Sequence, residues 1–109
     1  MTALTKLIKE ALQDFGLTEK ESEVYIYLAK SCIQETKTIS KRLSMHKAQV
    51  YRILGNLRNK GLVKSTFEVP MRFEAVPLES FFDLIIKIKK EELSVLEGRR
   101  KELLNHWKA

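Results

Sequence analysis

The chain has 109 residues, of which 44% are apolar and 31% charged, so the sequence predicts one folded domain with a single modest core. The longest apolar run, residues 24–29, is too short for a membrane span, and the charged N-terminal segment lacks the apolar centre of a signal peptide, so we expect a cytoplasmic protein. The net charge of +6 is concentrated in residues 36–67, which contain eight Lys or Arg and no acid, and this block favours a polyanionic partner.

Three helices are predicted in the first half of the chain. Residues 4–15 have apolar side chains at helical spacing, and Gly16 is expected to end that helix. Thr18 and Glu21 match the capping box that starts a second helix. A short third helix follows over residues 36–43, with Thr36 as its expected N-cap.

A fourth helix, over residues 47–60, follows after the tight connection of Ser44 and Met45. Two short helices joined in this way predict a helix-turn-helix, whose second helix enters the major groove of DNA. Gly61 stops the fourth helix, and the alternating segments LVKSTFEV and MRFEAV then predict a two-stranded hairpin around Pro70.

A last helix is predicted from Pro77 to the end of the chain, about 30 residues long. The expected fold is therefore mainly α with a small β-hairpin, a winged helix-turn-helix plus a long C-terminal helix. We assign residues 1–16 to a helix that contributes to a dimer, residues 17–77 to a winged-helix DNA-binding domain, and residues 78–109 to a C-terminal dimerisation helix.

The helix over residues 47–60 has an outward face without carboxylates, which suits contact with DNA. Arg can bond two guanine acceptors, and Gln or Asn can pair with adenine in the same bidentate way. The candidates for base contact are Ala48, Gln49, Arg52 and Asn56. Candidates for phosphate contact are the surrounding basic residues and one amide, namely Lys37, Lys41, Arg42, Lys47, Asn59, Lys60, Lys64 and Arg72.

Two residues of this helix have two interpretations each. Gly55 is unfavourable inside a helix, and it either lets the helix approach a groove wall or makes room for a neighbouring helix. Tyr51 lies at the edge of the apolar stripe, where it either packs half-buried or donates its hydroxyl to a phosphate.

The C-terminal helix has a heptad seam, which predicts a homodimer. Phe82, Lys89, Leu96 and Leu103 fall at d, and Ile86, Leu93, Arg100 and Trp107 fall at a. With Leu4 and Ile8 of the first helix, the interface candidates are Leu4, Ile8, Phe82, Ile86, Leu93, Leu96, Leu103 and Trp107. A two-fold dimer implies a pseudo-palindromic site in double-stranded DNA.

Catalysis is not expected. The chain has no Gly-rich phosphate loop, Cys32 is the single cysteine, and His46 and His106 are not spaced for metal binding, so we expect no cofactor and no metal. A protein-interaction module within the transcription machinery is the alternative, and it would favour an apolar or mixed-charge face on residues 47–60. RNA binding, a third possibility, would favour more exposed aromatic residues.

Three segments, GLTEKESEVYIYL, HKAQVYRILGNLRNKGLV and RFEAVPLESF, resemble the N-terminal winged-helix domain of archaeal TrmB-type transcriptional regulators, which are related to the MarR fold. The resemblance covers about residues 15–85 and implies a dimeric repressor or activator, with Gln49 and Arg52 on the recognition helix. Larger members of the family carry a sugar-binding effector domain, which is not expected within these 109 residues. The expected wing also differs from the family, because Glu68, Val69, Pro70 and Met71 stand where Gly and basic residues are usual. Whether an effector binds is left open.

Overall fold

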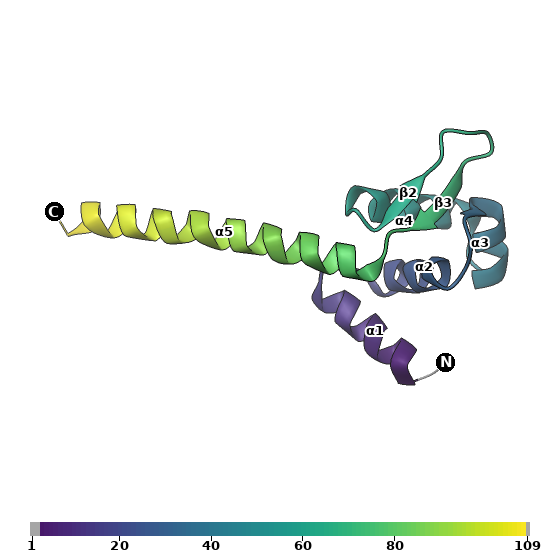
Figure 1. Ribbon diagram of the computed structural model, residues 1–109, viewed down its shortest axis with the longest axis horizontal. Coiled ribbons are helices and arrows are strands. Elements are labelled where there is room, and N and C mark those ends of the chain that lie inside the picture. The colour runs from purple at the N-terminus through teal and green to yellow at the C-terminus, as the bar shows by residue number, and fades with distance from the viewer. Residues whose placement is uncertain (1–2, 109) are drawn as a thin grey trace. The chain divides into compact units, whose positions relative to one another are not determined.

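The computed structural model describes residues 3–108, which form two compact units, one up to Leu78 and one from Glu79 (Figure 1). Residues 1, 2 and 109, the outermost parts of the predicted segments 1–16 and 78–109, lie outside the described residues. The first unit comprises α1 (Ala3–Asp14), α2 (Glu19–Ala29), β1 (Gln34–Glu35), α3 (Thr36–Leu43), α4 (Lys47–Asn59), β2 (Val63–Ser65) and β3 (Arg72–Ala75). The second unit is formed by α5 (Leu78–Trp107) from its second residue onward.

The core of the first unit is built from the apolar stripes that the sequence predicts. Buried side chains come from each of its helices and from β2 and β3, and they include Leu12, Val24, Leu28, Ile39, Val50, Leu54, Leu57, Val63 and Phe73. Burial of such stripes supplies most of the stability of short helices like these.

Two helices of the first unit end in the same way, with a glycine in the left-handed conformation. Gly16 after α1 has φ +98° and Gly61 after α4 has φ +84°. The leucine after each glycine donates its N–H to the carbonyl oxygen of a buried leucine five residues earlier, at 3.1 Å after α1 and 2.9 Å after α4. This is the Schellman arrangement, which explains why a glycine ends each helix.

The predicted capping box of α2 is confirmed. Thr18 Oγ1 accepts from the backbone N–H of Glu21 at 3.1 Å, and Glu21 Oε1 accepts from the backbone N–H of Thr18 at 2.9 Å. Glu21 is buried even though it is charged.

The predicted helix-turn-helix is formed by α3 and α4, but α3 begins differently from the prediction. Thr36 is the first helical residue, and Glu35 holds the N-cap position without a side-chain hydrogen bond. Glu35 is also the last residue of β1, where it lies opposite Arg72 of β3. The turn between the helices depends on Ser44, which has φ +53°.

The hairpin is confirmed, and a third short strand joins it. The sheet has the order β1-β3-β2 with both pairings antiparallel. Val63 pairs with Ala75 and Ser65 with Phe73, while Gln34 also lies opposite Phe73 on the other side of β3. A two-residue strand has no periodicity in the sequence, so β1 could not be predicted from its pattern.

Candidate nucleic-acid interface

The helix α4 has one buried side and one open side. Val50, Ile53, Leu54 and Leu57 are buried. Ala48, Arg52, Asn56 and Asn59 are exposed, and no carboxylate occurs between Glu35 and Glu68. The open side therefore presents amide, guanidinium and methyl groups, which match the hydrogen-bonding and methyl groups of the major groove.

Gln49 and Arg52, two of the four candidates for base contact, differ in exposure. Arg52 is exposed, whereas Gln49 is half-buried. Within residues 3–108 neither side chain has a hydrogen bond or an ion pair. Both polar ends are thus free of intramolecular partners.

Asn56 and Lys60, one helical turn apart, lie beside Glu21 of α2. Lys60 Nζ donates to Glu21 Oε1 at 2.7 Å and to the carbonyl oxygen of Gly16 at 3.1 Å. Burial raises the pKa of Glu21, but hydrogen bonds from Lys60, the Thr18 backbone and Asn56 outweigh burial, and the pKa lies below its ordinary value. The structure therefore gives Lys60 a role in joining α4 to α2, and part of the Asn56 side chain is engaged in the same place.

The other phosphate-contact candidates lie on the surface. All are exposed: Lys37, Lys41, Arg42, Lys47, Asn59, Lys64 and Arg72. They come from α3, α4, β2 and β3, so both the helix-turn-helix and the hairpin carry exposed candidates. Arg58 donates to Ser65 Oγ at 3.1 Å and links α4 to β2.

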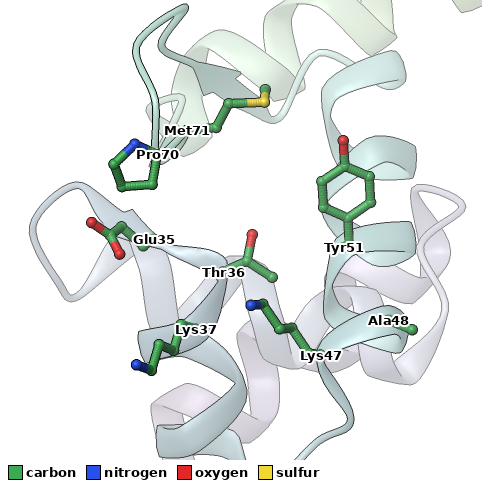
Figure 2. Close-up of a pocket in the computed structure, with 8 residues that line it drawn as sticks. All are labelled: Glu35, Thr36, Lys37, Lys47, Ala48, Tyr51, Pro70 and Met71. Atoms are coloured by element: carbon green, nitrogen blue, oxygen red, sulfur yellow. The ribbon is translucent and has the colours of Figure 1, made fainter.

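An open groove of about 950 Å³ separates the beginning of α4 from the loop between β2 and β3. Figure 2 shows Pro70 and Met71 of that loop on one side, Lys47, Ala48 and Tyr51 of α4 on another, and the start of α3 with Thr36 below them. The sequence did not predict this groove, because the loop that forms it is distant in the chain from both helices.

Tyr51 is 56% exposed and lines the groove. This exposure is compatible with both of its interpretations, half-buried packing and a hydroxyl donated to a phosphate. Its ring forms part of the groove wall (Figure 2).

Gly55 is not required by a neighbouring helix. A Cβ built at this position has no atom within 4 Å. The explanation by tight helix contact is therefore wrong, and close approach to an external surface remains.

The helices α3 and α4 both begin without a side-chain cap. Glu35 and His46 hold the N-cap positions, and neither forms a side-chain hydrogen bond there. The first amides of a helix carry a partial positive charge and are suited to phosphate oxygens.

The predicted dimer residues are largely exposed. In α1, Leu4 is exposed and Ile8 half-buried, and in α5 Phe82 is half-buried. Five more residues of α5 are exposed: Ile86, Leu93, Leu96, Leu103 and Trp107. Exposed apolar side chains in such number are typical of an interaction surface.

The part of the chain that the structure describes has neither a candidate metal site nor a candidate membrane-spanning helix. Residues 3–108 contain no group of three or more His, Cys, Asp or Glu side chains that could hold a metal ion. No helix among them is long and apolar enough to cross a membrane.

Comparison with known families gives a match over most of the first unit. The family model described as "Sugar-specific transcriptional regulator TrmB" matches residues 12–79, which contain α2, α3, α4 and the hairpin. That description is one of transcriptional regulators and not of enzymes, in agreement with the sequence.

Among individual proteins, the HTH-type sugar sensing transcriptional regulator TrmBL1 of Pyrococcus furiosus is 29% identical over 98 residues. The match covers 90% of this chain and 28% of that relative, so the chain spans less than a third of its length.

Two solved structures have the same fold. The archaeal chromatin protein TrmBL2 is similar with a TM-score of 0.76 and 23% identity, over 93% of this chain and 41% of that one. A possible transcriptional regulator from Methanosarcina mazei is similar with a TM-score of 0.65 and 18% identity, over 93% of this chain and 88% of that one.

Proposed function

The chain belongs to the TrmB family of transcriptional regulators, and from that membership we propose that it binds double-stranded DNA with sequence specificity as a homodimer, with α4 in the major groove. The observation that carries this proposal is the open face of α4. That face is free of carboxylates, and the guanidinium of Arg52 on it is exposed and unpaired among the described residues.

Base reading is assigned to the N-terminal half of α4. Residues near the start of a recognition helix reach deepest into the groove, which favours Ala48, Gln49 and Arg52. Asn56 lies farther along α4 and interacts with Glu21, so its amide is only partly available.

Phosphate contact is assigned to the exposed basic residues around α4. Lys37, Lys41 and Arg42 of α3 would contact the strand on one side of the groove, and Lys64 and Arg72 of the hairpin the strand on the other. Lys47 and Asn59 mark the two ends of α4. These contacts fix the register of the protein on DNA without reading its sequence.

The homodimer is proposed from the exposed apolar residues of α1 and α5. A lone helix that exposes Leu93, Leu96, Leu103 and Trp107 to water is unfavourable, and a second copy of the seam would cover them. A two-fold dimer would present two copies of α4 to successive major grooves, and its binding site would be pseudo-palindromic.

The proposal is tested by selecting bound duplexes from a random library and measuring affinity against salt concentration. If about six phosphates are neutralised per dimer, the logarithm of the association constant falls with a slope of about −5 against the logarithm of salt concentration. A pseudo-palindromic sequence should emerge from the selection. A flat salt response, or selection that enriches no sequence, would contradict the proposal.

A further inference from the structure

The loop between β2 and β3 carries apolar side chains in full contact with water. Phe67 is 102% exposed and Val69 is 97% exposed, the two most exposed large apolar residues among those described. In Figure 1 the loop extends beyond the sheet at the end of the hairpin. Two fully exposed apolar side chains close together at a loop tip offer an apolar contact to a partner.

The base of this loop is firmly closed. The backbone N–H of Thr66 donates to the carbonyl oxygen of Arg72 at 2.9 Å, and the backbone N–H of Arg72 donates to Thr66 Oγ1 at 3.0 Å. Pro70 further restricts the backbone of the tip. The tip is thus presented in a defined form, and binding through it orders few additional residues.

Basic residues flank the apolar tip. Lys64 and Arg72, on the two strands that lead to the loop, are both exposed. Pro70 and Met71 of the loop line the same groove as Ala48 and Tyr51 of α4. The tip therefore continues the surface that we assign to DNA, and a duplex on α4 would have its next groove beside the loop.

From this arrangement we propose that Phe67 is an apolar wedge, which enters the minor groove of DNA and partly unstacks one base step. This inference rests on the proposed function. Proteins that kink DNA insert side chains such as Phe, Leu or Met between bases while Arg or Lys hold the adjacent backbone. Phe67 with Lys64 and Arg72 supplies both parts.

The size of the tip favours DNA over a protein as its partner. A stable protein interface takes about 800 Å² from each side and some 20 residues or more. The loop offers only Phe67, Val69, Pro70 and part of Met71 as apolar contacts. A wedge, in contrast, requires a single side chain. Glu68, between Phe67 and Val69, would be repelled by phosphates and limits the affinity of the tip.

The wedge also predicts which sequences are preferred next to the recognition site. Pyrimidine–purine steps, TA above all, unstack at the lowest cost in energy. The tip should therefore favour TA steps at positions that α4 does not contact.

The test uses the full chain and a duplex of about 30 base pairs of alternating dT and dA, with one adenine replaced by 2-aminopurine and a fluorophore pair at the ends. Binding of the wild-type chain should raise 2-aminopurine fluorescence, because unstacking removes its quenching, and should shorten the end-to-end distance by bending. Phe67→Ala should abolish both signals and weaken binding at least about fivefold. Phe67→Leu, which keeps a wedge, should retain most of both.

Because the Phe67 side chain is fully exposed, both variants should have the same melting temperature as the wild-type chain, and thermal unfolding checks this. If the wild-type chain binds without unstacking or bending the duplex, the proposal that Phe67 is a wedge is wrong, and the apolar tip is better explained by contact with a protein. The proposed DNA binding would not be affected by that result. Equal signals from wild type and Phe67→Ala would overturn the wedge as well. Absence of binding to any duplex would overturn both proposals.

Discussion

The ammonium of Lys60, at the end of α4, lies 2.7 Å from Oε1 of Glu21, a carboxylate buried in the first turn of α2. The same oxygen caps α2 by accepting the backbone N–H of Thr18. Lys60 also donates to the carbonyl oxygen of Gly16, which ends α1. One ion pair thus joins the end of the proposed recognition helix to the turn between α1 and α2, and it helps to fix the position of α4 against α2.

The first prediction concerns how the free energy of unfolding changes at acidic pH. The pKa of Glu21 is lowered below its ordinary value of 4.5, because the bonds to its charged form outweigh burial. A lowered pKa in the folded state means that the carboxylate stabilises the fold above about pH 4.5, and that this contribution is lost as pH falls through the folded pKa. Glu21→Gln should flatten the decline in the free energy of unfolding below that pH, measured by urea denaturation. The exposed Glu10→Gln should leave the decline unchanged, and parallel curves for wild type and Glu21→Gln would contradict the prediction.

The second prediction separates Lys60 from the other lysines. Lys60→Met leaves the carboxylate of Glu21 without its cation and should lower the free energy of unfolding by about 1–2 kcal/mol. This is a small loss for a buried charge that loses its partner, because Lys60 is partly exposed and solvent already weakens the ion pair. Lys64→Met, on the exposed side of β2, should leave stability unchanged and reduce the salt dependence of DNA binding. The two effects are read by urea denaturation and by affinity titrations at several salt concentrations. If Lys64→Met destabilised the protein and Lys60→Met did not, the assignment of the two lysines would be reversed.

Local signals in the sequence were sufficient to predict much of this unit. Gly16, Gly61 and the pair of Thr18 with Glu21 mark helix ends through contacts within six residues, and the structure has each of them. The Lys60–Glu21 pair spans 39 residues, and β1 has two, so neither has a local pattern. Contacts of this kind depend on how elements pack, which periodicity does not specify.

The long helix α5 shows the same limit. The heptad assignment predicted one apolar stripe, yet Leu84, Ile88 and Val95 are also exposed, and they fall on the side opposite to Ile86 and Leu93. A heptad assignment describes a single seam and does not specify what covers the apolar residues outside it. A two-stranded coiled coil would cover one stripe only, so the second requires further contacts.

The third prediction uses two helical glycines, Gly55 and Gly98, at positions with room for a side chain. A Cβ at Gly55 or at Gly98 has no atom within 4 Å, so alanine at either site should stabilise its helix by up to about 1 kcal/mol. If α4 approaches DNA at Gly55, the added methyl group should weaken DNA binding in Gly55→Ala alone. Thermal unfolding and DNA titrations of the two variants distinguish the effects. Unchanged affinity of Gly55→Ala would remove the functional explanation of this glycine.

The fourth prediction concerns base reading by Arg52. Arg52→Ala should cost about 1–3 kcal/mol on the selected duplex and relax the preference at one base pair, because a bidentate contact to guanine is lost. Lys41→Ala should instead weaken all duplexes by a similar factor. Selection with each variant, followed by titration on matched and mismatched duplexes, measures the difference. A uniform loss for Arg52→Ala would assign this residue to the phosphates.

The last prediction tests the dimer through the seam of α5. Leu96 is 63% exposed and lies at a d position, so a second copy would bury it, and Leu96→Glu would place a charge in the interface at high cost. The wild-type chain should have twice its mass of 12.7 kDa in solution, and the variant should have the monomer mass by light scattering. Ser94→Glu introduces the same charge outside both stripes and should stay dimeric. Leu96→Glu should also lose most of its affinity for a pseudo-palindromic duplex while retaining its helical content, because two linked copies of α4 bind more tightly than one. A wild-type monomer, or a Leu96→Glu variant that still dimerises, would show that the exposed residues of α5 are covered in some other way.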